Sequence, residues 1–169
     1  VAEELKRLGR KPAFLSRGYG GRLAGPHLVE PSRDDARAVG DEPLLLARMA
    51  PVMIARDRVA GAEAIETRIP TADVLIMDDG MQNPTLAKDL TLAVVDASRG
   101  LGNGRVVPAG PLRAPLGPQL ARTDAIIVNR QVAHQGTNDD AANTLRRSFA
   151  GPVLAATTVP ESDTDWLQD

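Results

Sequence analysis

The 169-residue sequence contains no cysteine, and only 2% of its residues are aromatic. The lack of cysteine excludes disulfides, thiolate zinc sites and cysteine nucleophiles. The scarcity of aromatic residues argues against a surface that stacks the bases of single-stranded nucleic acid. A net charge of −2 offers no broad attraction to nucleic acid or anionic lipid, so we expect no nucleic-acid partner. No apolar run approaches the roughly 18 residues of a membrane-spanning helix.

What the sequence does contain is typical of a soluble domain with an aliphatic core. Hydrophobic residues make up 43% and charged residues 25% of the chain. The length suits one domain, and we expect a single α/β core over residues 1–169. The chain has no initiator methionine and begins inside a helical pattern at residues 1–9, so we expect a fragment of a longer protein.

Short aliphatic segments alternate with helical patterns along the chain. The expected strands lie near residues 13–16, 52–55, 74–77, 91–96, 125–128 and 153–156. The expected helices lie near residues 1–9, 44–49, 58–67, 119–122 and 141–149, and a short hairpin fits residues 22–31. This alternation predicts a mostly parallel sheet with helices on both faces.

The strand at Val74–Met77 ends in Asp78, Asp79 and Gly80. Its continuous apolar run is typical of a strand buried on both faces of a parallel sheet. Ligands of such sheets bind outside the carboxyl ends of the strands, where Asp78 or Asp79 could hold magnesium beside a nucleotide phosphate. The alternative is a simple turn in which Gly80 supplies a positive φ.

Polar residues also follow two other expected strands or loops. Asp41 lies in a loop at residues 39–43, where it could cap the following helix with Pro43 as the first helical residue. Arg56 and Arg58 lie between a strand and a helix, where they could bind phosphate or simply face solvent.

Other polar or irregular segments have weaker signals. His27 fits an ordinary strand position, and His134 lies in a polar loop with no acid or cysteine at metal-ligand spacing, so we assign no role to either. Residues 106–118 contain four prolines and cannot form a regular helix or central strand. Long loops of this kind inside compact domains tend to be functional or disordered.

Six short motifs then occur in a fixed order. They are SRGYGG at 16–21, VGDEP at 39–43, ARDR at 55–58, DDGMQ at 78–82, RGLGNGR at 99–105 and PAGPLR at 108–113. Together with DAIIVN at 124–129, they resemble the tetraacyldisaccharide 4′-kinases, the lipid A 4′-kinases of Gram-negative bacteria. The resemblance extends to about Asn129 and more loosely beyond it.

The resemblance implies a P-loop kinase at the cytoplasmic face of the bacterial inner membrane. Such an enzyme transfers the γ-phosphate of ATP, with Mg²⁺, to the 4′-hydroxyl of a tetraacylated glucosamine disaccharide 1-phosphate. It also implies that Asp41 is the catalytic carboxylate and that Asp78 and Asp79 hold the magnesium ion. The residues that it places near the substrate or phosphates are Arg17, Tyr19, Glu42, Arg58, Gln82 and Arg113.

The sequence departs from the family pattern in three places. The G-x-x-x-x-G-K-[ST] phosphate loop is absent from it, and we expect that loop before Val1. A C-terminal lobe, with a histidine that partners the catalytic aspartate, is expected after Asp169. Ala114 stands where glutamate is more usual in the family. This chain alone is therefore expected to lack efficient catalysis.

Two other functions fit parts of the pattern. One is a non-catalytic nucleotide- or metal-binding module, and the other is a P-loop kinase that acts on a small soluble metabolite. The combination of the GDEP and DDGMQ motifs favours the lipid A precursor kinase over the second of these.

Overall fold

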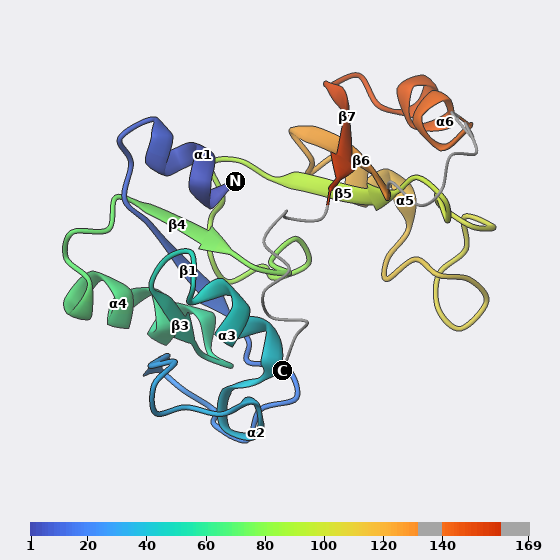
Figure 1. Ribbon diagram of the computed structural model, residues 1–169. Helices are drawn as coiled ribbons and strands as arrows, with labels where there is room; N and C mark the ends of the chain where they lie inside the picture. Colours follow the sequence, from blue (N-terminus) through green and yellow to red (C-terminus); the bar gives the residue numbers. More distant parts are fainter. Residues whose placement is uncertain (132–139, 160–169) are drawn as a thin grey trace. The chain divides into compact units, whose positions relative to one another are not determined.

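A computed structural model describes residues 1–131 and 140–159 (Figure 1). The chain forms two compact units, Val1–Ala87 and Lys88–Asp169. Each is an α/β unit with its own sheet, and each is described here by itself. His134 lies outside the described residues. Every helix in the described part of the chain is too short or too polar to cross a membrane.

The first unit contains a four-stranded sheet with the order β2-β3-β1-β4. Its strands are β1 (Pro12–Ser16), β2 (His27–Leu28), β3 (Val52–Ile54) and β4 (Val74–Met77). β1 is central and pairs in parallel with β3 and β4, which confirms the strands expected in these places. The hairpin expected over residues 22–31 is wrong, because β2 pairs antiparallel with β3 instead.

Alternating residues of this sheet pack into two separate cores. Phe14 and Ile54 face helices α1 (Ala2–Arg7), α2 (Ala36–Val39) and α3 (Asp41–Leu46). Leu15 and Met53 face the opposite side, where α4 (Arg58–Arg68) packs through Ile65. Helices therefore cover both faces of the sheet, as the alternation of elements predicts (Figure 1).

β4 is less buried than its apolar sequence suggests. Its residues are only partly buried, and Leu75 is 38% exposed, so the expectation of a strand buried on both faces is wrong. The reason is its place in the sheet. Among the described residues β4 pairs with β1 alone, and it is therefore an edge strand.

The second unit contains a three-stranded parallel sheet with the order β5-β6-β7. Its strands are β5 (Leu92–Asp96), β6 (Ala125–Gln131) and β7 (Val153–Thr158), and its helices are α5 (Leu116–Leu120) and α6 (Asp140–Ser148). Ile126 and Val128 of β6 pack against Leu145 of α6. These elements confirm the three strands and the helix expected near residues 141–149.

The helix α5 overlaps the helical turn expected at residues 119–122 but begins earlier, so the expectation that residues 106–118 contain no helix is wrong for residues 116–118. It is a single short helix that begins after Pro115 and includes Pro118 in its first turn. Proline is tolerated there because the N–H groups of a first turn have no partner within the helix.

Candidate active site

The carboxyl ends of β1 and β4 bring Ser16 and Asp78 together. In the parallel register Leu15 lies beside Met77, and the Asp78 N–H donates to the Leu15 carbonyl over 3.1 Å. Ser16 is only 2% exposed, and its Oγ donates to Asp78 Oδ2 over 3.2 Å. The backbone pairing and this side-chain bond together orient the Asp78 carboxylate at the sheet edge.

The turn after β4 differs from the one expected. Asp79 has the positive φ of +48°, whereas Gly80 is not among the residues with positive φ, so that detail of the turn interpretation is wrong. Gly80 instead packs closely against Met77, since a Cβ there would overlap the Met77 side chain. The left-handed conformation of Asp79 is one that aspartate tolerates better than most residues.

A glycine-rich loop at residues 17–21 follows β1 and packs against the start of α3. A Cβ on Gly40 would lie 2.5 Å from the Tyr19 carbonyl oxygen, and a Cβ on Gly21 would lie 2.6 Å from the Val39 carbonyl carbon. Gly40 also has a φ of +93°, which side chains rarely adopt. Two glycines therefore let the backbone of this loop approach the residue that precedes Asp41.

Asp41 is the first residue of α3, and Gly40 is the N-cap. The expectation that Asp41 caps a helix starting at Pro43 is therefore wrong, because the helix begins earlier. The exposed Asp41 side chain accepts a hydrogen bond only from the neighbouring Glu42 N–H, over 3.0 Å, among the interactions that the described residues show. Its second carboxylate oxygen has no protein donor among them and remains available to a ligand.

The acids of α3 and of the turn after β4 lie within electrostatic range of one another. Partial burial, and then the charges of Asp78, Asp41 and Asp79, raise the pKa of the Glu42 carboxyl. Within the described residues no three acidic or histidine side chains are arranged to hold a metal ion by themselves. Mg²⁺ at a phosphoryl-transfer site needs only one or two carboxylates together with phosphate and water oxygens. The donor set therefore fits magnesium bound with a nucleotide.

Arg58 places a buried cation next to these acids. It is only 6% exposed, its Nη1 donates to the Ala55 carbonyl over 2.6 Å, and its Nε has no acceptor in the described part of the chain. Burial and the charge of Arg17 lower the pKa of its guanidinium, against the opposing effect of Asp78 and Asp79. Arg58 therefore lies within electrostatic range of both Arg17 and the acid pair.

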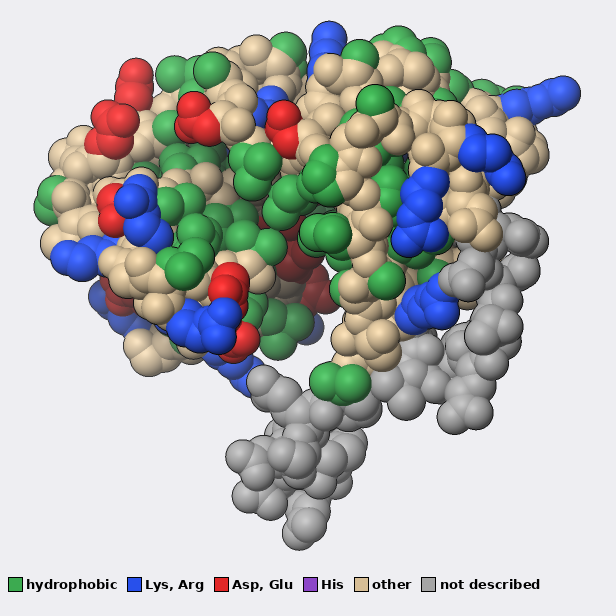
Figure 2. Space-filling model, turned by 90° about the horizontal axis from the view of Figure 1, so that it is seen from above, with side chains coloured by type: hydrophobic (Ala, Val, Ile, Leu, Met, Phe, Trp, Pro, Cys, Tyr) green, Lys and Arg blue, Asp and Glu red, His purple; other side chains and the backbone are tan. Residues whose placement is uncertain are grey.

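The remaining predicted residues lie in three different places. Tyr19 is in the glycine-rich loop and is 83% exposed, and Gln82 is exposed in the turn that follows β4. Arg113 is exposed in the second unit, in the segment before α5. On the face that Figure 2 shows, acidic and basic side chains are interspersed over the first unit. The catalytic and binding roles of all these residues stay predictions.

Sequence reasoning gave no role to Ser16, although it is the first residue of the SRGYGG motif. The available signal was its position, since it is a polar residue at the end of an otherwise apolar strand. His27, to which the sequence analysis also gave no role, lies outside this group of residues and pairs with Asp34 through Nε2 and Oδ2 at 2.8 Å.

The family model described as tetraacyldisaccharide-1-P 4′-kinase matches residues 1–167. The chain belongs to this family. It is 53% identical over 161 residues to the tetraacyldisaccharide 4′-kinase of Nitrobacter winogradskyi, and this alignment covers 95% of the chain and 46% of that protein. It is 60% identical over 159 residues to the Bradyrhizobium sp. tetraacyldisaccharide 4′-kinase, and this alignment covers 94% of the chain and 44% of that protein. The chain thus spans about half the length of these curated family members.

The fold is also similar to a solved structure of a family member. A crystal structure of LpxK from Aquifex aeolicus, described as an "apo" form in complex with ATP, matches with a TM-score of 0.64 and 20% identity. The match covers 96% of this chain and 69% of that one. It confirms the predicted P-loop NTPase-like α/β fold, present here in part.

Proposed function

We propose that the chain is part of a kinase that phosphorylates the 4′-hydroxyl of a tetraacylated glucosamine disaccharide 1-phosphate. The observation that carries this proposal is that three aspartates, Asp41, Asp78 and Asp79, lie within electrostatic range of Glu42 in a member of the tetraacyldisaccharide-1-P 4′-kinase family. ATP is the proposed phosphate donor, and the relative from Aquifex aeolicus was crystallised with it.

In this mechanism the oxygen of the 4′-hydroxyl attacks the γ-phosphorus of ATP, and ADP leaves as the bond between the γ-phosphorus and the bridging oxygen breaks. The exposed Asp41 carboxylate accepts the hydroxyl proton. Arg58 stabilises the negative charge on the transferred phosphate, and Arg17 binds a phosphate group of one of the two substrates. Asp78 and Asp79 would hold Mg²⁺, which neutralises phosphate charge when bound.

A lipid acceptor implies that the protein works at a membrane surface. We place the enzyme at the cytoplasmic face of the inner membrane of a Gram-negative bacterium, where ATP is available. Cell fractionation tests this location: the full-length protein should sediment with inner-membrane vesicles, and protease added to spheroplasts should not cleave it. Recovery from the periplasmic fraction would contradict it.

A transfer assay with the full-length protein tests the activity. We expect ³²P to move from γ-labelled ATP to the tetraacyl disaccharide 1-phosphate when Mg²⁺ is present. An acceptor in which hydrogen replaces the 4′-hydroxyl should remain unlabelled, which assigns the position. A full-length protein that is folded and binds ATP but never labels the disaccharide would overturn the proposal.

A further inference from the structure

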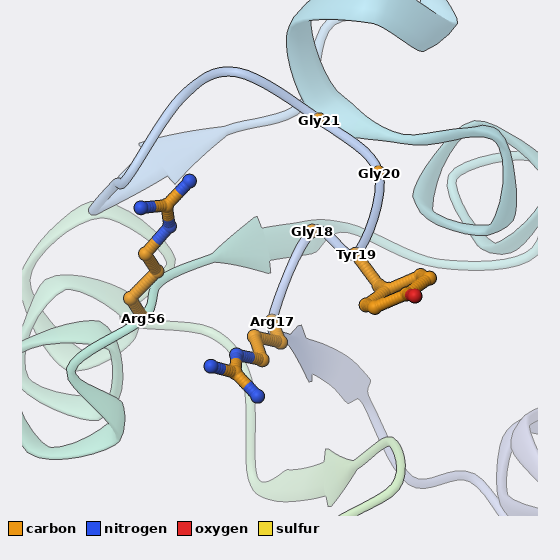
Figure 3. A pocket seen from close by; sticks show the side chains of 6 residues that line it. All are labelled: Arg17, Gly18, Tyr19, Gly20, Gly21 and Arg56. Atoms are coloured by element: carbon orange, nitrogen blue, oxygen red, sulfur yellow. The ribbon is translucent and has the colours of Figure 1, made fainter.

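A cavity of about 240 Å³ lies beside the glycine-rich loop (Figure 3). It is lined by residues 17–21 and by Arg56, which comes two residues after β3 ends. The Arg17 and Arg56 side chains extend on the same side of the loop, whereas the Tyr19 ring points away from Arg56. Two cations from different segments therefore share one small space.

The charged residues that line this cavity are both arginines. No acidic residue is among the described residues that line it. Neither the Arg17 nor the Arg56 guanidinium forms an ion pair within residues 1–131 and 140–159. By contrast, Arg7, Arg10 and Arg33 each lie next to a carboxylate. An anion in the cavity would be attracted by both guanidiniums.

The backbone of the loop that lines the cavity also carries hydrogen-bond donors. Gly18 and Gly20 have φ values of +69° and +79°. In this conformation the N–H groups of Tyr19 and Gly20 donate to no acceptor among the described residues. Concave loops with free N–H groups are suited to binding anions.

Arg56 is held at the cavity by backbone pairing rather than by side-chain contacts. Its N–H donates to the Ala24 carbonyl over 2.8 Å, and the Ala55 N–H donates to the Ser16 carbonyl over 3.0 Å. The backbone at Arg56 is therefore fixed beside the loop, while its exposed side chain can turn toward a ligand. Such an arrangement positions a binding residue before the ligand arrives.

We propose that Arg17 and Arg56 together bind a phosphate group of a kinase ligand, and that Arg56 determines the affinity for that group. Guanidinium groups bind phosphate through paired N–H donors, and the cavity is large enough for a phosphate and the adjoining part of a sugar. This inference rests on the proposed function for the identity of the ligand. The group is either the 1-phosphate of the disaccharide or a phosphate of ATP.

Steady-state kinetics of the full-length enzyme distinguish these two sources. We expect Arg56→Gln to raise one KM by roughly tenfold or more, as for the loss of a charge-assisted bidentate contact. A higher KM for the disaccharide assigns the cavity to the 1-phosphate, and a higher KM for ATP assigns it to the nucleotide. Arg56→Lys should recover only part of the affinity, because lysine lacks the planar fork.

Arg68→Gln is the matched control. Arg68 is an exposed arginine in the last turn of α4, at the far end of that helix from Arg56, and its removal changes the net charge equally. It should leave both KM values unchanged. If Arg56→Gln behaves like Arg68→Gln for both substrates, the proposal is wrong.

A second measurement does not depend on kinase activity. Phenylglyoxal modifies accessible arginines, and peptide mass spectrometry reports the modified fraction at each site. Glucosamine 1-phosphate should protect Arg17 and Arg56 but not Arg68, whereas glucosamine with chloride at the same ionic strength should protect none. Protection in a protein without kinase activity would retain the phosphate site and reject only the proposed function. Equal modification with and without the sugar phosphate would overturn the site itself.

Discussion

Ser16 Oγ donates a hydrogen bond to Asp78 Oδ2 over 3.2 Å, and this bond joins the ends of two parallel strands. The Gly18 N–H also approaches Ser16 Oγ, at 3.4 Å. One buried hydroxyl thus links the glycine-rich loop to an acid proposed to hold magnesium. We regard Ser16 as a positioning residue, because its contacts are with Asp78 and Gly18.

Replacing Ser16 by alanine should loosen the Asp78 carboxylate. A hydrogen bond to a charged group contributes about 1.5 kcal/mol or more, so we expect Ser16→Ala to weaken metal affinity by roughly tenfold. Electron paramagnetic resonance of Mn²⁺ titrated into the full-length protein with a non-hydrolysable ATP analogue measures this directly. The Mg²⁺ concentration needed for half-maximal activity should rise in parallel.

Ser98 offers a matched control for this variant. Its Oγ donates to Asp96 Oδ1 over 2.5 Å, in the second unit and at an exposed position. Ser98→Ala removes the same kind of bond and should leave Mn²⁺ affinity unchanged. Equal Mn²⁺ affinity in Ser16→Ala and the wild type would show that Asp78 needs no help from this hydroxyl.

Arg58 and Arg56 allow a comparison of a buried and an exposed arginine in one segment. Arg58→Met retains an apolar stem but leaves the buried Ala55 carbonyl without its donor, so we expect a loss of about 1 to 2 kcal/mol in the free energy of unfolding. Arg56→Met removes an exposed side chain and should change stability by less than about 0.5 kcal/mol. Urea unfolding of the two variants measures the difference. Equal stabilities would mean that the Arg58 hydrogen bond contributes nothing.

Much of the order of strands and helices could be read from the sequence because aliphatic runs alternate with helical spacing, but the short helix α2 was not predicted. α4 was predicted within one residue at each end, because its apolar residues recur at helical intervals. The burial of β4 could not be predicted in this way, because the same apolar run suits a central strand or an edge strand. Only the strand order decides between them.

Some features of the candidate site could likewise be predicted from the sequence, and others could not. The acids at the end of β4 were predicted because polar residues after an apolar strand are conspicuous. The start of α3 was misplaced because Pro43 is favoured at a first helical position, whereas the backbone of Gly40 fixes the start at Asp41. The pairing of Ser16 with Asp78 depends on strand register between residues 62 positions apart, which no local pattern contains.

The pH dependence of stability should report the crowding of acids at Glu42. Burial and the neighbouring Asp78, Asp41 and Asp79 raise the pKa of its carboxyl above the ordinary value of 4.5. The folded state therefore binds this proton more tightly than the unfolded state. The resulting stabilisation is complete below pH 4.5 and is lost as the pH rises through the folded-state pKa.

Glu42→Gln should accordingly raise the unfolding temperature at pH 7, and this gain should vanish when the pH falls to about 4. Thermal unfolding followed by circular dichroism over this pH range tests the expectation. Glu63→Gln, an exposed change on α4, is the control and should show no such pH-dependent gain. A Glu42→Gln variant that is no more stable than wild type at pH 7 would contradict the electrostatic crowding.

Asp41→Asn tests the proposed proton acceptor with little change in shape. Loss of a general base costs typically 10²- to 10⁴-fold, so we expect kcat of the full-length enzyme to fall by about that factor while KM for ATP stays within about twofold. Asp89→Asn, at an exposed position in the second unit, should retain full activity. A kcat within about twofold of wild type would remove Asp41 as the base.

Gly40→Ala tests whether the close contact between the glycine-rich loop and α3 positions Asp41. Alanine at a φ of +93° is strained, and its Cβ would lie 2.5 Å from the Tyr19 carbonyl oxygen, so either the loop or the start of α3 must move. We expect kcat to fall by tenfold or more, since small displacements of a reacting group cost roughly 10²-fold. Gly9→Ala has a similar φ of +76° but meets nothing within 4 Å, so it isolates the backbone strain. It should lower the unfolding temperature without changing kcat, and equal kcat values for the two variants would show that the Gly40 contact does not position Asp41.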